Sequence, residues 1–125
     1  PDIAHDGANP ERADYRQVIL RDRLLAALAR INPHIPTAAL EQVVHIVQTI
    51  SEPQAVVRNR SFHRLLLSGV AVEFSVGDEK KTDLVNLIDF ANPQRNEFLV
   101  INQFTAPTKF LRLSKTASRT SANAT

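Results

Sequence analysis

The chain has 125 residues, of which 43% are hydrophobic, so it is long enough to bury the core of one ordinary domain. It contains no cysteine, which excludes a disulfide framework and a thiolate metal site, and no apolar run approaches the roughly 18 residues of a membrane-spanning helix. Residues 1–103 hold eleven Lys or Arg against thirteen Asp or Glu, whereas residues 104–125 hold four basic residues and no acid. These features predict a cytoplasmic protein whose excess positive charge lies in its last residues.

The N-terminal half has the pattern of an arm followed by two helices. Residues 1–14 mix Gly, Pro, Asn and charged residues, which is typical of a flexible arm. Apolar residues spaced by three and four from Tyr15 to Ile31 predict a first helix, which Pro33 ends. A second helix is predicted with Thr37 as its N-cap and an apolar stripe along one side. The stripe consists of Leu40, Val43, Val44, Val47 and Ile50.

A third helix is predicted up to about Ser68. Ser51 and Gln54 have the spacing of a capping box at its start, and Gly69 supplies the left-handed residue that ends many helices. Its apolar residues are interrupted by Arg58, Arg60 and Arg64. These three arginines suit contacts with DNA phosphates, but a solvated helix face is the alternative.

The pattern changes to a period of two after Gly69, which predicts strands. Residues 70–76 alternate as a half-buried strand, and residues 77–80 form a turn. Residues 84–90 predict a second strand, and residues 97–104, which are apolar on both faces, a central third one. The fold class is therefore α+β, with three N-terminal helices followed by a small, mainly antiparallel sheet. We expect an arm at 1–14, a domain at 15–105 and a basic, disordered tail at 106–125.

Several common catalytic motifs are absent. The three glycines, Gly7, Gly69 and Gly77, cannot form a P-loop or a dinucleotide-binding turn. Glu41 and His45 would share a helix face and are able to bind a metal, but a solvated polar side is the better interpretation. Asp83 and Asp89 would lie on one face of the second strand as a carboxylate pair, an interpretation that we also rank below a structural one. His63 is expected to be partly buried.

Three segments resemble the N-terminal part of the R subunit of type I restriction enzymes. The first, residues 14–36, is similar to the opening helix and turn of that family. Residues 60–73, which include FHRLL and GVAVE, resemble a second family segment, and residues 85–104, with LIDFANP and NQF, a third. The resemblance covers about residues 13 to 105, and the order and spacing of the segments make it specific.

The resemblance implies a complex that restricts DNA. In that family the subunit carries a nuclease domain of the PD-(D/E)xK type and ATP-driven translocase domains, and it works with modification and specificity subunits. Its nuclease acids and Lys hold Mg²⁺ and follow the strand that ends in NQF. This chain has no Asp or Glu after Phe104, so no catalytic, metal or cofactor residue carries over. Its end is faintly similar to the family's next stretch, with Leu113 at the Glu position; unrelated coding after a truncation is the alternative.

The leading interpretation is a fragment or remnant of a restriction subunit that is catalytically incomplete and binds DNA weakly, so its status as an enzyme stays open. The alternative is a non-catalytic adaptor that docks on a restriction complex or on DNA, and the missing acids argue against an independent nuclease. We also expect self-association through an exposed sheet edge at residues 97–104. The candidate DNA contacts are Arg58, Arg60, Arg64, Lys109, Arg112 and Lys115.

Overall fold

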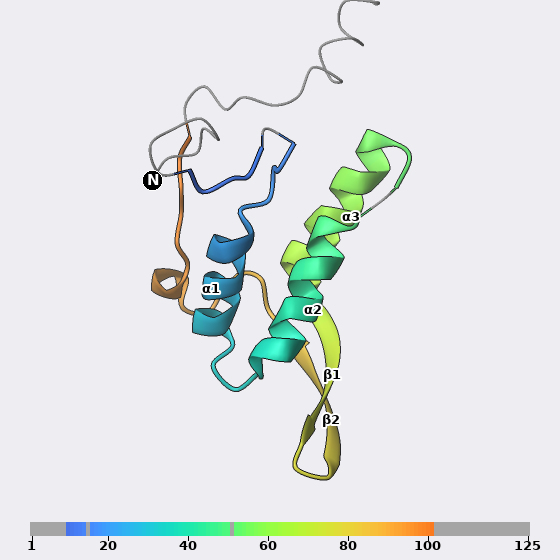
Figure 1. Ribbon diagram of the computed structural model, residues 1–125, viewed down its shortest axis with the longest axis vertical. Helices are drawn as coiled ribbons and strands as arrows, with labels where there is room; N and C mark the ends of the chain where they lie inside the picture. The colour runs from blue at the N-terminus through green and yellow to red at the C-terminus, as the bar shows by residue number, and fades with distance from the viewer. Residues whose placement is uncertain (1–9, 15, 51, 102–125) are drawn as a thin grey trace, which may run out of the picture. The chain divides into compact units, whose positions relative to one another are not determined.

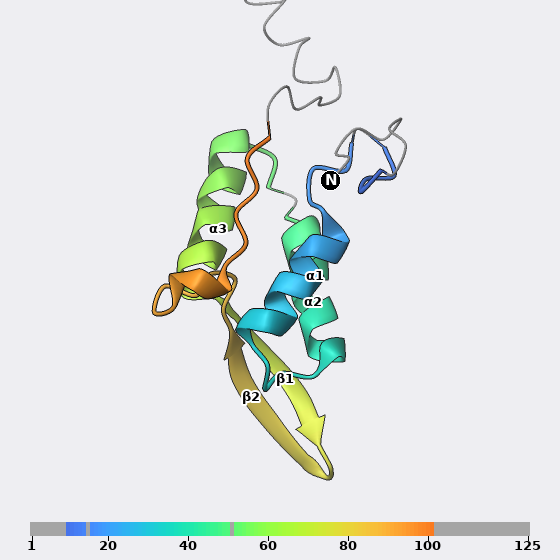
Figure 2. The same ribbon diagram turned by 90° about the vertical axis from the view of Figure 1, so that its left-hand side faces the viewer.

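The computed structural model describes residues 10–14, 16–50 and 52–101. They belong to two compact units, and residues 21–99 form the unit that holds the helices and strands described below. In chain order it contains α1, α2 and α3, followed by the strands β1 and β2, as Figures 1 and 2 show. The predicted α+β class, with three helices ahead of an antiparallel sheet, is confirmed.

Helix α1 spans Arg21–Ile31, so it begins six residues later than the sequence predicted. The described residues 16–20 are not helical, and Tyr15 lies outside the described residues. Asp14 explains the difference, because its carboxylate accepts hydrogen bonds from the backbone N–H groups of Arg16, at 2.6 Å, and Gln17, at 3.2 Å. Such local bonds offer the backbone an alternative to the helix, and here the alternative prevails.

Helix α2, Thr37–Gln48, is the centre of the core. Five of its residues are buried, among them the four residues of the predicted stripe that lie within the helix; Ile50 follows its end and is half-buried. Thr37 is the first helical residue, so the prediction of Thr37 as N-cap was wrong. The N-cap is Pro36 in an extended conformation, without a side-chain capping bond, because proline's fixed φ already suits a helix start.

Helix α3, Ala55–Ser68, has no buried residue. Its N-cap is Gln54, whose side chain makes no capping bond, so Gln54 does not play the part predicted for it in a capping box, and Ser51 lies outside the described residues. The predicted stop is confirmed: Gly69 has a φ of 72° and donates to the carbonyl of Leu65. A Cβ at Gly69 would lie 2.6 Å from the carbonyl oxygen of Val85, so the close approach of the strand also requires glycine.

Strands β1, Val70–Val76, and β2, Glu79–Val85, form an antiparallel hairpin. The register runs from Val70 opposite Val85 to Val76 opposite Glu79, around a two-residue turn in which Gly77 has a φ of 61°. The prediction of a second strand at 84–90 was therefore wrong. A two-residue turn pairs the residues directly before it with those directly after it, so the polar residues that begin β2 pair with the end of β1. Residues 86–90 are not part of the sheet.

The segment after β2 is a loop that contains one short 3-10 turn, Pro93–Arg95. Residues 97–101, where a central strand was predicted, are not in a strand, and residues 102–104 lie outside the described residues. Phe98 is 81% exposed and Val100 is 94% exposed. The apolar character of this segment therefore does not reflect burial on both faces of a sheet within the part of the chain that the structure describes.

The core lies between α1, α2 and the base of the hairpin. Its largest fully buried apolar side chains are Leu28, Leu40, Val43, Val44 and Val85. Asn32, only 1% exposed, lies among them and joins the end of α1 to the end of β2. Its amide accepts a bond from the N–H of Asn86 and donates to the carbonyls of Asn86 and Leu28, each at 2.9 Å, so the buried polar group is satisfied.

Candidate nucleic-acid interface

The basic residues of α3 do not all lie on the same side of the helix. Arg60 and Arg64 are four residues apart, so they are neighbours on one face, and both are exposed. Arg58 lies about 160° around the helix from Arg60, at 100° per residue, and is half-buried. His63 is exposed beside the first two, so the expectation that it is partly buried was wrong. The structure therefore brings together two of the three predicted arginines.

The three arginines of α3 have no internal partner among the described residues. No hydrogen bond or ion pair within that part of the chain involves Arg58, Arg60 or Arg64, and α3 contains no acidic residue. The helix therefore carries three positive charges that form no ion pair among the described residues. Arg60 and Arg64, two unpaired cations on one face of the helix, are therefore candidates for contacts with phosphates.

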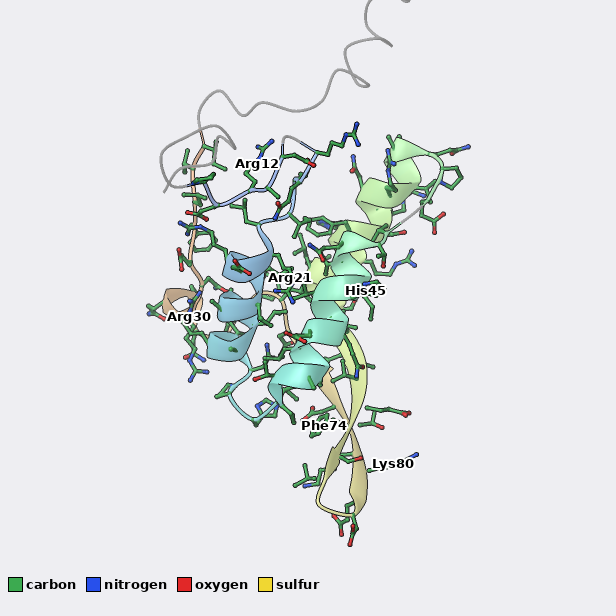
Figure 3. All side chains as sticks on the ribbon, viewed as in Figure 1. Arg12, Arg21, Arg30, His45, Phe74 and Lys80 are labelled. Carbon is green, nitrogen blue, oxygen red and sulfur yellow. The ribbon has the colours of Figure 1, made fainter. Side chains whose placement is uncertain are left out.

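The arginines of α1 are paired instead (Figure 3). Arg21 lies 3.5 Å from Glu41 of α2 and 3.4 Å from Asp22. Arg23 contacts the carboxylate of Glu97. Arg30 lies 3.6 Å from the same carboxylate and also donates to the carbonyl of Arg95 at 2.7 Å. The arginines of α1 are therefore paired with acids of the same chain.

A groove of about 410 Å³ lies beside the basic face, between the C-terminal end of α2 and α3. Arg64, Ser61 and Leu65 line it from α3, while Glu52 lines it from the segment between the two helices. The α2 side adds Ile46, Thr49 and Ile50. The groove thus combines one cation, one carboxylate and two hydroxyl groups with apolar side chains. Of the other predicted contacts, Lys109, Arg112 and Lys115 lie outside the described residues.

The acidic residues considered as a metal site are separated by the fold. Asp83 lies on β2, where its carboxylate is 3.2 Å from the imidazole of His34. Asp89 lies beyond the end of β2, so the two do not share a strand face, and that prediction was wrong. Glu41 of the Glu41–His45 pair contacts Arg21 instead, and Figure 3 shows His45 on α2. No group of three or more His, Asp or Glu able to hold a metal ion occurs within residues 10–14, 16–50 and 52–101.

Asp89 instead organises the loop after β2, a role that sequence reasoning missed. Its carboxylate accepts from the N–H of Asn92 at 2.9 Å and lies 3.8 Å from Arg95. The amide of Asn96 accepts from the N–H of Asp89 and donates to its carbonyl, each at 2.9 Å, and donates also to the carbonyl of Pro93. The sequence signal for such a loop is the cluster of Asp, Asn and Pro, residues that favour local side-chain to backbone bonds.

The described helices are all too short or too polar to cross a membrane. What the chain presents is a small α+β unit with one unneutralised basic helix and a loop fixed by Asp89 and Asn96. A family described as "Type I restriction enzyme R protein N terminus" matches residues 1–117, and the chain belongs to that family.

Two curated relatives bear the corresponding names. The type I restriction enzyme MjaIXP endonuclease subunit of Methanocaldococcus jannaschii is 43% identical over 94 residues, which are 75% of this chain and 9% of that protein. The type I restriction enzyme HindI endonuclease subunit of Haemophilus influenzae is 35% identical over 92 residues, which are 74% of this chain and 9% of that protein. The chain thus spans about a tenth of the length of these relatives. No solved structure matches.

Proposed function

We propose that this region serves DNA restriction as a non-catalytic segment that contacts the DNA backbone through α3. Arg60 and Arg64 contact neighbouring phosphates, and Arg58 adds positive charge on the far side of the helix. The observation that carries the proposal is the absence of any internal partner for these three arginines among the described residues. Family membership supplies the context, since the relatives are named as endonuclease subunits of restriction enzymes.

Binding of this kind is weak and independent of sequence, because phosphate contacts carry no base information. Non-specific dissociation constants are typically about 10⁻⁴ to 10⁻⁶ M at physiological salt. Each phosphate that an arginine neutralises adds about 0.9 to the slope of log affinity against log salt. Arg60 and Arg64 together should therefore contribute about 2 to that slope.

The test compares two double variants by fluorescence anisotropy on a labelled duplex. Arg60→Ala with Arg64→Ala should weaken binding about tenfold near 0.1 M salt and lower the salt slope by about 2. The matched control, Arg21→Ala with Arg30→Ala, removes the same charge by the same substitution from α1, whose arginines are paired, and should change both quantities much less. Equal losses in the two variants would mean that net charge alone matters, and the α3 interface would be rejected.

A truncated chain distinguishes DNA binding by the C-terminal tail from DNA binding by α3. If Lys109, Arg112 and Lys115 carried all of the binding, a chain ended after Thr105 would lose it, as the charge distribution of the sequence predicts. The α3 proposal requires that the shortened chain still bind, and that Arg60→Ala with Arg64→Ala still weaken it. Loss of all binding on truncation would assign the contact to the tail.

The proposal places the Mg²⁺ and ATP chemistry of the enzyme class outside this chain. Asp83, Asp89 and Glu97 each contact a basic residue, and the described residues contain no group of three or more acids or histidines that could hold a metal ion for hydrolysis. Supercoiled plasmid incubated with the chain, Mg²⁺ and ATP should stay intact. Nicking that disappears in an Asp83→Ala or Asp89→Ala variant would contradict the proposal.

A second candidate is an adaptor that docks on other subunits of a restriction complex, such as the modification or specificity subunit. Val56 and Leu67, on the same side of α3 as Arg60, are 67% and 58% exposed, and phosphate contacts do not need them. The variant Val56→Ser with Leu67→Ser separates the two functions. Unchanged DNA affinity favours the DNA role of the arginines, whereas capture of the modification or specificity subunit that is lost in this variant favours the adaptor.

A further inference from the structure

The two edges of the hairpin differ in how well they are protected. A two-residue turn makes Val76 and Glu79 a hydrogen-bonded pair, so the backbone groups of Ala71, Glu73 and Ser75 point away from β2. Among the described residues nothing pairs with them. On β2 the corresponding edge is guarded: the N–H of Leu84 is bonded to the carboxylate of Asp83 at 2.7 Å, and Lys80 and Lys81 lie on the strand. Lysine on an edge strand is a common barrier to pairing.

The open edge of β1 also has the composition of a pairing strand. Val70–Val76 contains three valines and a phenylalanine, and Glu73 is its only charge. Its distal half extends beyond the helices in Figures 1 and 2, so no helix obstructs an approaching strand. Val76 is 50% exposed, and Figure 3 shows Phe74 and Lys80 on this part of the hairpin.

We propose that β1 pairs antiparallel with β1 of a second copy of this chain around a two-fold axis at Phe74. This register places Phe74 opposite its own symmetry mate, Glu73 opposite Ser75 and Val72 opposite Val76. The result is a four-stranded sheet in which β1 is no longer an edge. An interface of this type is self-complementary, as two-fold symmetry requires. The proposal rests on the hairpin alone and is independent of the proposed function.

Charge complementarity selects this register over its neighbours. Ser75 is paired with Lys80 inside the hairpin, so the new pairing makes a row of Lys80, Ser75 and Glu73 of the partner subunit across three strands. The Cα atoms of Lys80 and of the partner's Glu73 are two strand spacings apart, about 10 Å. The two long side chains bridge this distance over the small serine. Neither Glu73 nor Lys80 has an ion pair among the described residues. A register shifted by two residues places Glu73 opposite Glu73, which is repulsive.

The register 75 opposite 75 places Glu73 opposite Gly77, beyond the end of the partner's strand, so the charged row is lost. The register 72 opposite 72 is blocked. Val72 is 4% exposed and is part of the core, so centring the pair there brings the helices of both copies together. The sequence predicted an exposed edge at residues 97–104, but the described residues 97–101 are not a strand. The edge proposed for self-pairing is therefore β1, the first strand, and not the predicted strand at residues 97–104.

A charge exchange tests the register in the full chain by sedimentation equilibrium. The wild type should dimerise at concentrations up to about 100 µM, and either Glu73→Lys or Lys80→Glu should raise the dimer dissociation constant about tenfold, because each creates two like-charge contacts by symmetry. The double exchange should return the constant to near the wild-type value. Both residues are exposed, so folding is preserved, which far-UV circular dichroism checks. A wild type that stays monomeric, or a double exchange no better than the single variants, overturns the proposal.

Disulfide trapping gives a second, geometric readout, because the chain has no cysteine of its own. In Phe74→Cys the two thiols face each other as a non-hydrogen-bonded pair, whose Cβ atoms are close enough for a disulfide. The control is Thr82→Cys on β2, which lies at the far side of the four-stranded sheet. Mild oxidation should convert Phe74→Cys to a reducible dimer at least about tenfold faster than Thr82→Cys. Equal rates would mean random collisions and would reject the pairing.

Discussion

Helices α1 and α3 contain the same number of arginines, but those of α1 form ion pairs and, among the described residues, those of α3 do not. Each carries three arginines among apolar residues. In α1 the arginines contact Asp22, Glu41, Glu97 and a backbone carbonyl, and Leu28 and Ile31 are buried. In α3 no residue is buried, and the described part of the chain offers its arginines no partner. The composition of a helix therefore does not decide whether its charges are paired within the fold; the position of acids elsewhere in the chain does.

The largest expected effect concerns apolar burial on the two helices. Leu28→Ala on α1 should lower the free energy of unfolding by about 3 kcal/mol, because Leu28 is fully buried and the cavity cannot collapse completely. The same substitution at Leu67 on α3, which is 58% exposed, should change it by less than about 0.5 kcal/mol. Urea denaturation followed by circular dichroism measures both. A comparable loss at Leu67 would show that α3 is packed in solution.

A smaller effect is expected for the polar join of α1 to the hairpin. Asn32→Ala leaves the part-buried N–H and C=O of Asn86 without their partners and should cost about 2 kcal/mol. Asn59→Ala on α3 is the matched control, since Asn59 is exposed and alanine favours the helix. The difference between the two variants in urea measures the join itself. If Asn32→Ala were as harmless as Asn59→Ala, water would be replacing the amide.

Helix α2 was predictable because its apolar spacing matches its burial, whereas α3 was found from its pattern although none of its residues is buried. Leu40, Val43, Val44 and Val47 were assigned to one stripe and are all buried, and Gly69 ends α3 as its type and position predict. Their starts were harder, because Asp14 and Pro36 act through local geometry that competes with periodicity.

The second strand could not be found from hydrophobicity. β2 is polar, and its position follows from the turn at Gly77 and Asp78 rather than from its own side chains. For the candidate site, the arginines of α3 were visible in the sequence. Their lack of partners was not, since an acid such as Glu97 reaches α1 from 74 residues away in the chain.

The smallest expected effect tests whether pairing with Glu97 keeps the arginines of α1 from contributing to DNA binding. Glu97→Gln removes the carboxylate that Arg23 and Arg30 share, while Arg30 keeps its bond to the carbonyl of Arg95. The side chains of Arg30 and Glu97 are 39% and 56% exposed, so the loss in stability should stay below about 1 kcal/mol.

The more informative readout of Glu97→Gln is binding to DNA. If neutralisation by Glu97 keeps α1 from contacting phosphates, the variant should steepen the salt slope by about 1, because released arginine charge becomes available to DNA. Glu79→Gln on the hairpin makes the same change of net charge at an exposed residue that has no ion pair among those described, and it should leave the slope almost unchanged. Equal slopes in the two variants would mean that α1 lies away from DNA whatever its charge. The contrast between α1 and α3 would then be one of position on the molecule, not of pairing.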